Sequence, residues 1–288
     1  MTSVTWFKLV TVAGLLVGQI LCKRQYIEMT HEIHDRVVTY PGMPKFNFTN
    51  LERGDKRGFW VEYNKFQLSE HAGTHIDAPI HFNQHGRYLH EVPLDNLVGP
   101  GVIVDITHRA KRDRRAEVNV EDILRWEDTH GKIPKGSFVI MKSGWFRKYP
   151  DTTQIFGVDV NRFPSTDFRF PGISPAAAQW LIDHREINGV GGDTPSPDRG
   201  GGSHMRTHLI ILGANKVILE NVANLDKVPP SGATIYALPI NLHRGSGGPL
   251  RIFATLNDGE DFDYSGSGRS LPLTGATLFC VLFVKLMY

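Results

Sequence analysis

Apolar runs rich in β-branched residues recur through the middle of the chain, and each run has the length of a buried strand. The runs cover 101–106, 138–141, 216–220, 234–238 and 250–254. The chain holds 29 glycines and 17 prolines, which indicates many turns along the sequence. This pattern argues against a helical bundle, and before residue 100 it favours strands and loops.

Helical signals fall between several of these runs. Asn119 can cap a helix that ends near Gly131. Ser174 can cap a second helix that continues to residue 184, because the proline after it tolerates the first helical position. A third expected helix covers 203–213, with its cap at Ser203. Helices that alternate with strands after residue 119 predict an α/β domain.

The composition is that of a globular protein. The 288 residues are 41% hydrophobic and 22% charged, and this length supplies a sizeable core. Lys and Arg total 32 against 30 for Asp and Glu, a formal net charge of +2. This balance gives no electrostatic case for nucleic-acid binding, so we expect no nucleic-acid partner.

The N-terminus resembles a secretory signal. Lys8 precedes an apolar run over 9–21, and polar Lys23 follows it. The run has the length of a signal-peptide core and is short for a bilayer span; an uncleaved anchor or a buried segment is the alternative. We expect 1–22 to be a signal peptide cleaved near Cys22, and the mature protein to be secreted or held on the extracellular surface.

The C-terminus carries a similar pattern. Small residues at 265–268 precede a short spacer and then an apolar tail over 273–288. This is the layout of a GPI-attachment signal; a short membrane anchor or a frayed tail would also fit. The expected organisation is therefore a domain over 23–264 and a removable tail over 265–288, with membrane attachment through a lipid anchor as one outcome.

Two further features bear on export. The two cysteines, Cys22 and Cys280, both lie in the end segments, so a processed domain would hold no disulfide. Asn47-Phe48-Thr49 is a glycosylation sequon, usable only if the chain enters the secretory pathway.

The densest group of metal-ligand residue types lies within 71–81. Three histidines and one aspartate fall in these eleven residues. His75 and Asp77 are two apart, so an extended segment directs both to the same side, and a turn at Gly73 can bring His71 to the same centre. Imidazole and carboxylate suit zinc or manganese. The alternative is that these histidines are structural or solvated.

A second pair lies downstream. His208 falls in the third expected helix, where His204, four residues earlier, could share its face. Glu220 ends an apolar strand, and a carboxylate there is costly unless it is paired or bound to metal. Each residue could also be structural, since buried polar groups normally find partners.

The segment His71-Ala72-Gly73-Thr74-His75-Ile76-Asp77-Ala78-Pro79-Ile80-His81 resembles the signature of the cyclase-like metal-dependent hydrolases. That family includes bacterial kynurenine formamidase and isatin hydrolase. The resemblance extends over about residues 30 to 256 through weaker blocks in the expected order. These blocks are 40–44, 192–198, 208, 220–226, 237–240 and 247–251.

The resemblance implies a swivelling β/β/α domain with a mixed sheet, usually assembled as a homodimer. It implies that His71, His75 and Asp77 bind one divalent metal and that Asp77 bridges to a second. His208 would complete the second site, and Glu220 would contact both ions. Isatin hydrolase-like members use a single manganese, so we expect one or two Zn²⁺ or Mn²⁺ ions per chain.

The resemblance also assigns two residues outside the metal ligands. His81, the last histidine of the signature, would transfer the proton, and Tyr40 would line the substrate pocket. Two departures concern the substrate: Met43 stands where the family has an acidic residue, and the export signal contrasts with typically cytosolic bacterial members.

The resemblance implies hydrolysis of a small-molecule amide. A divalent metal lowers the pKa of bound water from about 16 toward about 7, and His81 would pass the proton to the leaving nitrogen. We found no Gly-x-Ser-x-Gly elbow, which separates the chain from α/β-hydrolase formamidases. The leading hypothesis is a kynurenine formamidase-type enzyme that converts N-formyl-L-kynurenine and water to L-kynurenine and formate. The alternatives are a cyclic-amide hydrolase of the isatin type and a secreted metal-binding protein without turnover.

Overall fold

The structure, a computed structural model, describes residues 25–56, 58–202 and 204–256. The expected signal peptide over 1–22, the C-terminal segment over 265–288, both cysteines and Ser203 lie outside the described residues. Across the described part of the chain, the helices all fall short of the length and apolar character needed to cross a membrane.

A central sheet of eight strands confirms the α/β class with mixed strand directions. Its order is β1-β12-β11-β5-β7-β9-β10-β4, and β4 also pairs with β12, so the sheet closes on itself there. The strands are β1 (Gln25–Glu28), β4 (His75–Asp77), β5 (Val98–Asp105), β7 (Phe138–Lys142), β9 (Gly189–Gly192), β10 (Val217–Glu220), β11 (Ala233–Pro239) and β12 (Gly247–Leu256). Strands β5, β7, β9 and β10 run parallel, and the remaining pairings in this sheet are antiparallel. All five predicted strand runs lie in this sheet.

Both faces of the parallel strands are buried, which explains why their sequences are continuously apolar. In β7, Phe138 and Ile140 belong to one hydrophobic cluster, while Val139 and Met141 belong to a second cluster on the opposite face. Successive side chains of a strand point to opposite faces. One short apolar segment therefore contributes to two cores.

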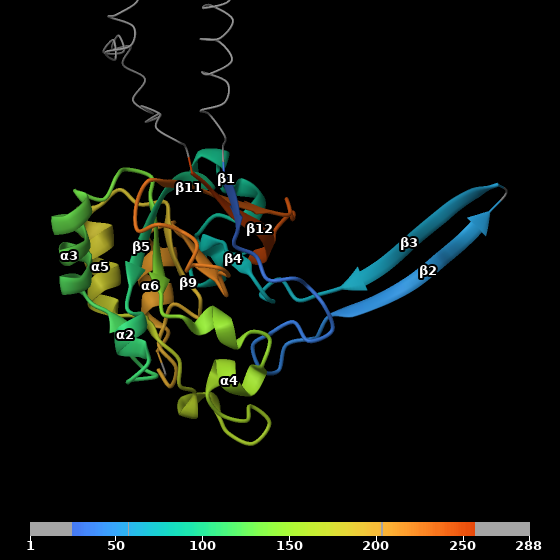
Figure 1. The fold of residues 1–288 in the computed structure, drawn as a ribbon, viewed down its shortest axis with the longest axis horizontal. Coiled ribbons are helices and arrows are strands. Elements are labelled where there is room, and N and C mark those ends of the chain that lie inside the picture. The colour runs from blue at the N-terminus through green and yellow to red at the C-terminus, as the bar shows by residue number, and fades with distance from the viewer. Residues whose placement is uncertain (1–24, 57, 203, 257–288) are drawn as a thin grey trace, which may run out of the picture. The chain divides into compact units, whose positions relative to one another are not determined.

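Helices cover the face that carries the second cluster. The structure has α2 (Thr107–Ala110), α3 (Val120–His130), α4 (Thr152–Phe156), α5 (Pro175–His184) and α6 (Arg206–Gly213). Figure 1 shows α3, α5 and α6 together on one side of the sheet, and Ile123, Leu181 and Ile211 from these three helices pack into the second cluster. The predicted caps are confirmed for α3, where Asn119 and Asp122 form a capping box, and for α5, where Ser174 accepts from the backbone N–H of Ala177.

Short elements complete the fold. They are the 3-10 helices η1 (Pro79–His81), η2 (Leu89–Glu91), η3 (Leu94–Asn96), η4 (Trp145–Lys148) and η5 (Ser165–Asp167), and the small parallel pair β6 (Glu117–Val118) and β8 (Gly172–Ile173). Strands β2 (Asn47–Lys56) and β3 (Phe59–Gln67) form a separate antiparallel hairpin. Figure 1 shows this hairpin projecting away from the central sheet.

The third helix is shorter than expected. It begins at Arg206 rather than at 203, because Met205 has a left-handed backbone with φ of 41° that cannot continue a right-handed helix. His204 precedes the helix and is exposed. The prediction that His204 shares a helix face with His208 is therefore wrong.

Candidate metal centre

Strand pairing builds one side of the centre. His75 and Asp77 occupy alternate positions of β4, which places both side chains on one face. In the antiparallel pairing of β4 with β10, Glu220 lies directly opposite His75, and His75 Nε2 lies 3.3 Å from Glu220 Oε2. All three side chains are buried. The register of two short strands thus brings together residues separated by about half the chain.

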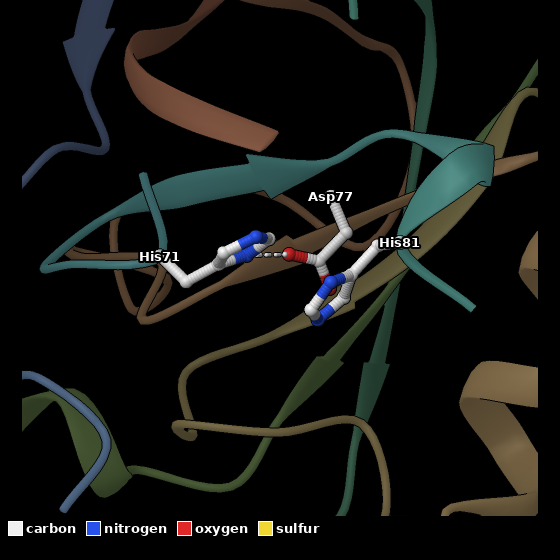
Figure 2. Close-up of side chains that lie close together, drawn as sticks. All are labelled: His71, Asp77 and His81. Carbon is white, nitrogen blue, oxygen red and sulfur yellow. Dashed lines mark hydrogen bonds and ion pairs between the residues drawn. The ribbon is translucent and has the colours of Figure 1, made fainter. Parts of the chain in front are cut away.

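A turn at Gly73 brings His71 to the same centre. Gly73 has φ of 60°, and a Cβ there would lie 2.8 Å from Val37 Cγ2, so this position needs glycine. Beyond the turn, His71 Nδ1 lies 2.7 Å from Asp77 Oδ1. His81, at the end of η1, stacks on His71 with 4.0 Å between ring centroids. Figure 2 shows His71 and His81 both beside the carboxylate of Asp77.

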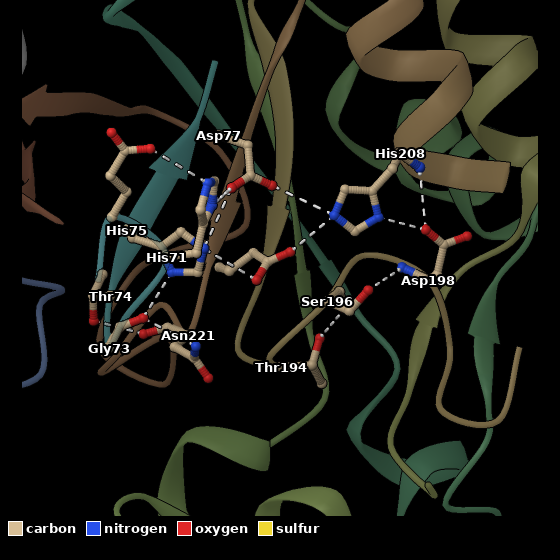
Figure 3. A network of polar contacts seen from close by, with 12 residues as sticks. His71, Gly73, Thr74, His75, Asp77, Thr194, Ser196, Asp198, His208 and Asn221 are labelled. Carbon is tan, nitrogen blue, oxygen red and sulfur yellow. Dashed lines mark hydrogen bonds and ion pairs between the residues drawn. The ribbon is translucent and has the colours of Figure 1, made fainter. Parts of the chain in front are cut away.

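The helical layer supplies His208. This residue lies in the first turn of α6, and its Nε2 atom is 3.4 Å from Asp77 Oδ2 and 3.3 Å from Glu220 Oε1. Figure 3 shows the His208 ring facing the carboxylate of Asp77 from the helix side. The five residues expected to bind metal therefore converge in the fold, along with His81.

Each of the three imidazoles nearest the carboxylates is also held from its far side. His208 Nδ1 donates to Asp198 Oδ2 at 2.6 Å (Figure 3), and His75 Nδ1 donates to the carbonyl oxygen of Gly73 at 3.0 Å. His71 Nε2 donates to Ser246 Oγ at 2.9 Å. These contacts leave Nε2 of His75, Nε2 of His208 and Nδ1 of His71 facing inward. Outer hydrogen bonds of this kind commonly fix the orientation and tautomer of metal-binding histidines.

Sequence reasoning missed three of these supporting residues. Asp198 lies in the 192–198 block of the family resemblance but received no role. Ser246 donates its hydroxyl hydrogen to Glu70 and immediately precedes the 247–251 block. Glu70 adjoins His71, and no spacing rule connects it with Ser246, 176 residues away. The position of Asp198 ten residues before His208 was the one usable signal.

The electrostatics of the cluster favour a bound cation. Burial opposes charge on Asp77, but contacts with His208, His71 and His75 hold its pKa well below the usual value. Burial and the neighbouring charge of Asp77 raise the pKa of Glu220. Against the opposing effect of burial, Asp77 and Glu220 raise the pKa of His75 to about 9. The two carboxylates thus stabilise positive charge among the imidazoles, which is the environment that a divalent cation requires.

The donor set fits a transition-metal ion. His71, Asp77 and His81 offer one group of ligand atoms, and His75, Asp77 and Glu220 offer another; within each group the atoms lie within 4.8 Å of one another. Asp77 belongs to both groups, and its Oδ2 atom is buried without a hydrogen-bond partner. Nitrogen and carboxylate donors suit Zn²⁺ or Mn²⁺. The chain can therefore hold one ion, or two that share Asp77.

A cavity of about 190 Å³ opens beside these side chains. Its walls away from the metal-ligand cluster include Val38, Thr39, Tyr40, Met43, Phe82, Pro195, Ser196, Met205 and Asn221. Tyr40 lines this cavity as expected. The ring of Tyr40 packs edge-on against Phe156 and Phe168, with centroid distances of 5.8 and 5.9 Å, and burial raises the pKa of its hydroxyl.

The mixed sheet, the buried cluster of histidine and carboxylate side chains and the adjacent cavity define an α/β protein with a candidate metal centre. The family model described as a putative cyclase matches residues 27–199, more than half of the chain. The chain therefore belongs to the Cyclase family, as the signature at 71–81 predicted.

Relatives place the chain among hydrolases. The isatin hydrolase of Roseibium aggregatum is 28% identical over 219 residues, covering 73% of this chain and 81% of that protein. The kynurenine formamidase of Salinibacter ruber is 27% identical over 235 residues, covering 82% and 98%.

Solved structures agree with this placement. An isatin hydrolase bound to the product analogue thioisatinate has a TM-score of 0.75 at 25% identity, covering 89% of this chain and all of that one. A predicted metal-dependent hydrolase from Bacillus stearothermophilus has a TM-score of 0.60 at 26% identity, covering 81% and 98%. The cyclase-like fold is thus confirmed.

Proposed function

We propose that the protein is a metal-dependent hydrolase of carbon–nitrogen bonds in amides. The observation that carries this proposal is the position of Asp77. Its carboxylate lies within 3.4 Å of ring nitrogens of His71, His75 and His208, in the wall of a cavity that also contains His81. Metal ligands and a separate proton acceptor beside one cavity are what amide hydrolysis by water requires.

The metal would be held by His71, His75, Asp77, His208 and Glu220. When bound, a divalent ion such as Zn²⁺ or Mn²⁺ supplies a water of lowered pKa and polarises a carbonyl oxygen. The carboxylates of Asp77 and Glu220 offset the positive charge. Asp198 and Ser246 keep the rings of His208 and His71 in place from behind.

His81 is the proposed proton-transfer residue. Burial lowers its pKa to about 4, so its imidazole is neutral at pH 7 and can accept a proton from the attacking water. The resulting imidazolium is a strong acid for its type and readily protonates the leaving nitrogen. The stacked ring of His71 fixes the plane of His81.

Two amides are candidate substrates. N-formyl-L-kynurenine, hydrolysed to L-kynurenine and formate, is the expectation from the family resemblance. A cyclic amide opened in the isatin manner is the second candidate, and the similarity to isatin hydrolases favours it. A metal-binding protein without turnover is the remaining alternative, and the retained His81 argues against it.

The test combines metal analysis with turnover. The full-length chain would be purified, its bound metal counted, and N-formyl-L-kynurenine and isatin assayed with and without a chelator. Hydrolysis that the chelator abolishes, and that Zn²⁺ or Mn²⁺ restores, is the expected result. Bound metal without hydrolysis of either substrate or of a wider amide panel would favour the binding-protein alternative.

We also propose that the chain is a homodimer, with the β2–β3 hairpin in the interface. Phe48 lies opposite Phe66 in the hairpin register, and both side chains and Trp60 are more than half exposed. An isolated two-stranded hairpin is only marginally stable in water, so a second copy that covers these rings would stabilise it. Light scattering should give twice the chain mass, and Trp60→Ser with Phe66→Ser should halve it. A monomeric wild-type protein would contradict the proposal.

We also propose that the protein is exported. The proposal rests on the signal-like pattern at the N-terminus, the GPI-like pattern at the C-terminus and the glycosylation sequon at Asn47. Asn47 of that sequon is exposed at the start of β2, where a glycosyltransferase can reach it. In secreting cells, glycosidase treatment should lower the apparent mass of the wild type but not of Asn47→Gln. Release from membranes by a GPI-cleaving phospholipase tests the lipid anchor. Retention of the protein inside the cell would contradict secretion.

A further inference from the structure

The substrate cavity lacks a counter-ion for an acidic substrate. Among the described residues that line it, the charged or ionisable groups are the metal-site histidines, Asp77, Glu220, His81 and the Tyr40 hydroxyl, with no lysine or arginine. The carboxylates and histidines are directed at the metal. The remaining walls are largely apolar, with Val38, Met43, Phe82 and Met205 among them.

Arginines lie just outside this cavity, behind Met205. A neighbouring cavity of about 230 Å³ is lined by Arg199 and Arg206, and Met205 lines both cavities. Glu117 and Asp198 also line the neighbouring cavity, and Arg199 pairs with Glu117 at 3.4 Å, so Arg206 is the arginine available to a carboxylate there. Met205 therefore lies at the boundary between the metal-site cavity and the arginine-lined cavity. An unbranched thioether is a flexible, apolar wall that accommodates aromatic rings.

The backbone of Met205 is unusual for its residue type. Its φ of 41° and ψ of 43° place it in the left-handed region, which residues other than Gly, Asn and Asp rarely adopt. Such backbone conformations concentrate at functional sites. This residue immediately precedes α6, and it lines both cavities.

We propose that Met205 is a specificity-determining residue that restricts the site to compact, uncharged aromatic amides. It does so by limiting the size of the cavity and by separating a bound substrate from Arg206. This inference rests on the proposed amide hydrolase function. It implies that a substrate with a free carboxylate remote from the scissile bond is disfavoured, because burying that charge without a partner is costly. N-formyl-L-kynurenine carries such a carboxylate, so this inference favours the isatin-type candidate over it.

The test uses two substrates that differ by one carboxylate group: formanilide and 4-formamidobenzoate, which share the formamide bond. For the wild-type full-length chain, kcat/KM should favour formanilide by at least about tenfold, the size of one missing charge-assisted hydrogen bond. Met205→Gly and Met205→Asn both suit the left-handed backbone. Each variant should reduce that preference about tenfold, chiefly through a lower KM for 4-formamidobenzoate.

Leu209→Ala is the matched control, because Leu209 lies four residues after Met205 in α6, is half exposed and lies outside the cavity lining. It should leave the preference unchanged. Equal kcat/KM values for the two substrates in the wild type, or an unchanged preference in both Met205 variants, would overturn the inference.

A binding measurement separates this inference from the proposed function. Phenylurea and 4-ureidobenzoate are the corresponding pair without a formamide, and calorimetry reports their affinities without turnover. Tighter binding of phenylurea by the wild type, with the difference reduced in Met205→Gly, would support the role of Met205 even if no amide is hydrolysed. Equal binding of both compounds would refute it, whatever the activity.

Discussion

Glu220 lies opposite His75 across the antiparallel pairing of β10 and β4, with 3.3 Å between Glu220 Oε2 and His75 Nε2. Both residues are buried at the point where a parallel strand meets the strand that closes the sheet. A carboxylate this deep in the protein is stable only when its charge is balanced. The pairing therefore ties the register of the sheet to metal binding.

Glu220→Gln should weaken metal binding at least about tenfold, because it keeps the side-chain shape but removes one negative charge and one strong ligand. Metal affinity would be measured by competition with a coloured chelator. Glu186→Gln is a suitable control, since Glu186 is exposed and pairs with Lys135 away from the site. Unchanged affinity in Glu220→Gln would show that Glu220 is not a ligand.

His81→Ala should retain its metal but lose at least about a hundredfold in turnover, the usual contribution of a general base. His81 stacks on His71 without a hydrogen bond between them, so removal of the His81 ring should leave the five proposed metal ligands in place. The control is His85→Ala, because His85 is exposed in the following turn. If the metal is lost together with activity, His81 is a ligand, as its grouping with His71 and Asp77 allows.

Local patterns in the sequence predicted the buried strands, two helix caps and the histidine signature, because each of these depends on residues close together in the chain. The buried strands follow from apolar runs, and the caps at Asn119 and Ser174 follow from side-chain hydrogen bonding. The signature at 71–81 was recognisable because its ligands are close in sequence. The start of α6 was mispredicted because the left-handed backbone of Met205 depends on its tertiary surroundings.

Long-range contacts explain what sequence reasoning missed. The support of His71 by Ser246 joins residues 175 positions apart, and it exists only because β12 pairs with β4. Nothing in either segment alone predicts that contact. The closure of the sheet by β4 was likewise invisible in a three-residue strand.

Asp198→Asn should reduce metal affinity about ten- to hundredfold, the usual cost of losing a hydrogen bond behind a metal ligand. Asp198 accepts from His208 Nδ1 at 2.6 Å and also from the backbone N–H groups of Thr207 and His208. The amide can no longer accept through both oxygens, so His208 loses its fixed tautomer. The measurement is metal affinity, with the exposed Asp183→Asn as the control. Unaltered metal affinity would show that Asp198 only caps the start of α6 and does not support metal binding.

Gly73→Ala should destabilise the fold by roughly 1–3 kcal/mol and weaken metal binding. The new Cβ would lie 2.8 Å from Val37 Cγ2 on a backbone with φ of 60°. The Gly73 carbonyl also accepts from His75 Nδ1, so a shift of this turn moves a ligand. Denaturant unfolding gives the stability. Gly213→Ala, where a Cβ meets open space, should be neutral or slightly stabilising, and equal behaviour of the two variants would contradict the argument.

His31 should make the protein less stable as the pH falls. Its ring stacks on Tyr149 with centroids 3.8 Å apart, and its Nε2 atom is buried without a hydrogen-bond partner. Burial lowers its pKa from 6.5 to about 4. Between these values the unfolded chain binds a proton that the folded chain does not, so the free energy of unfolding falls as the pH falls from about 6.5 toward about 4.

The full effect of that difference is about 3 kcal/mol. His31→Phe keeps a ring against Tyr149 and removes the titration. Its free energy of unfolding relative to the wild type should therefore rise by up to this amount between pH 7 and pH 4. Urea unfolding at several pH values measures the difference, and His85→Phe, at an exposed position, controls for the loss of any histidine. A difference between His31→Phe and wild type that stays constant with pH would mean that His31 becomes protonated in the folded protein as readily as in the unfolded chain.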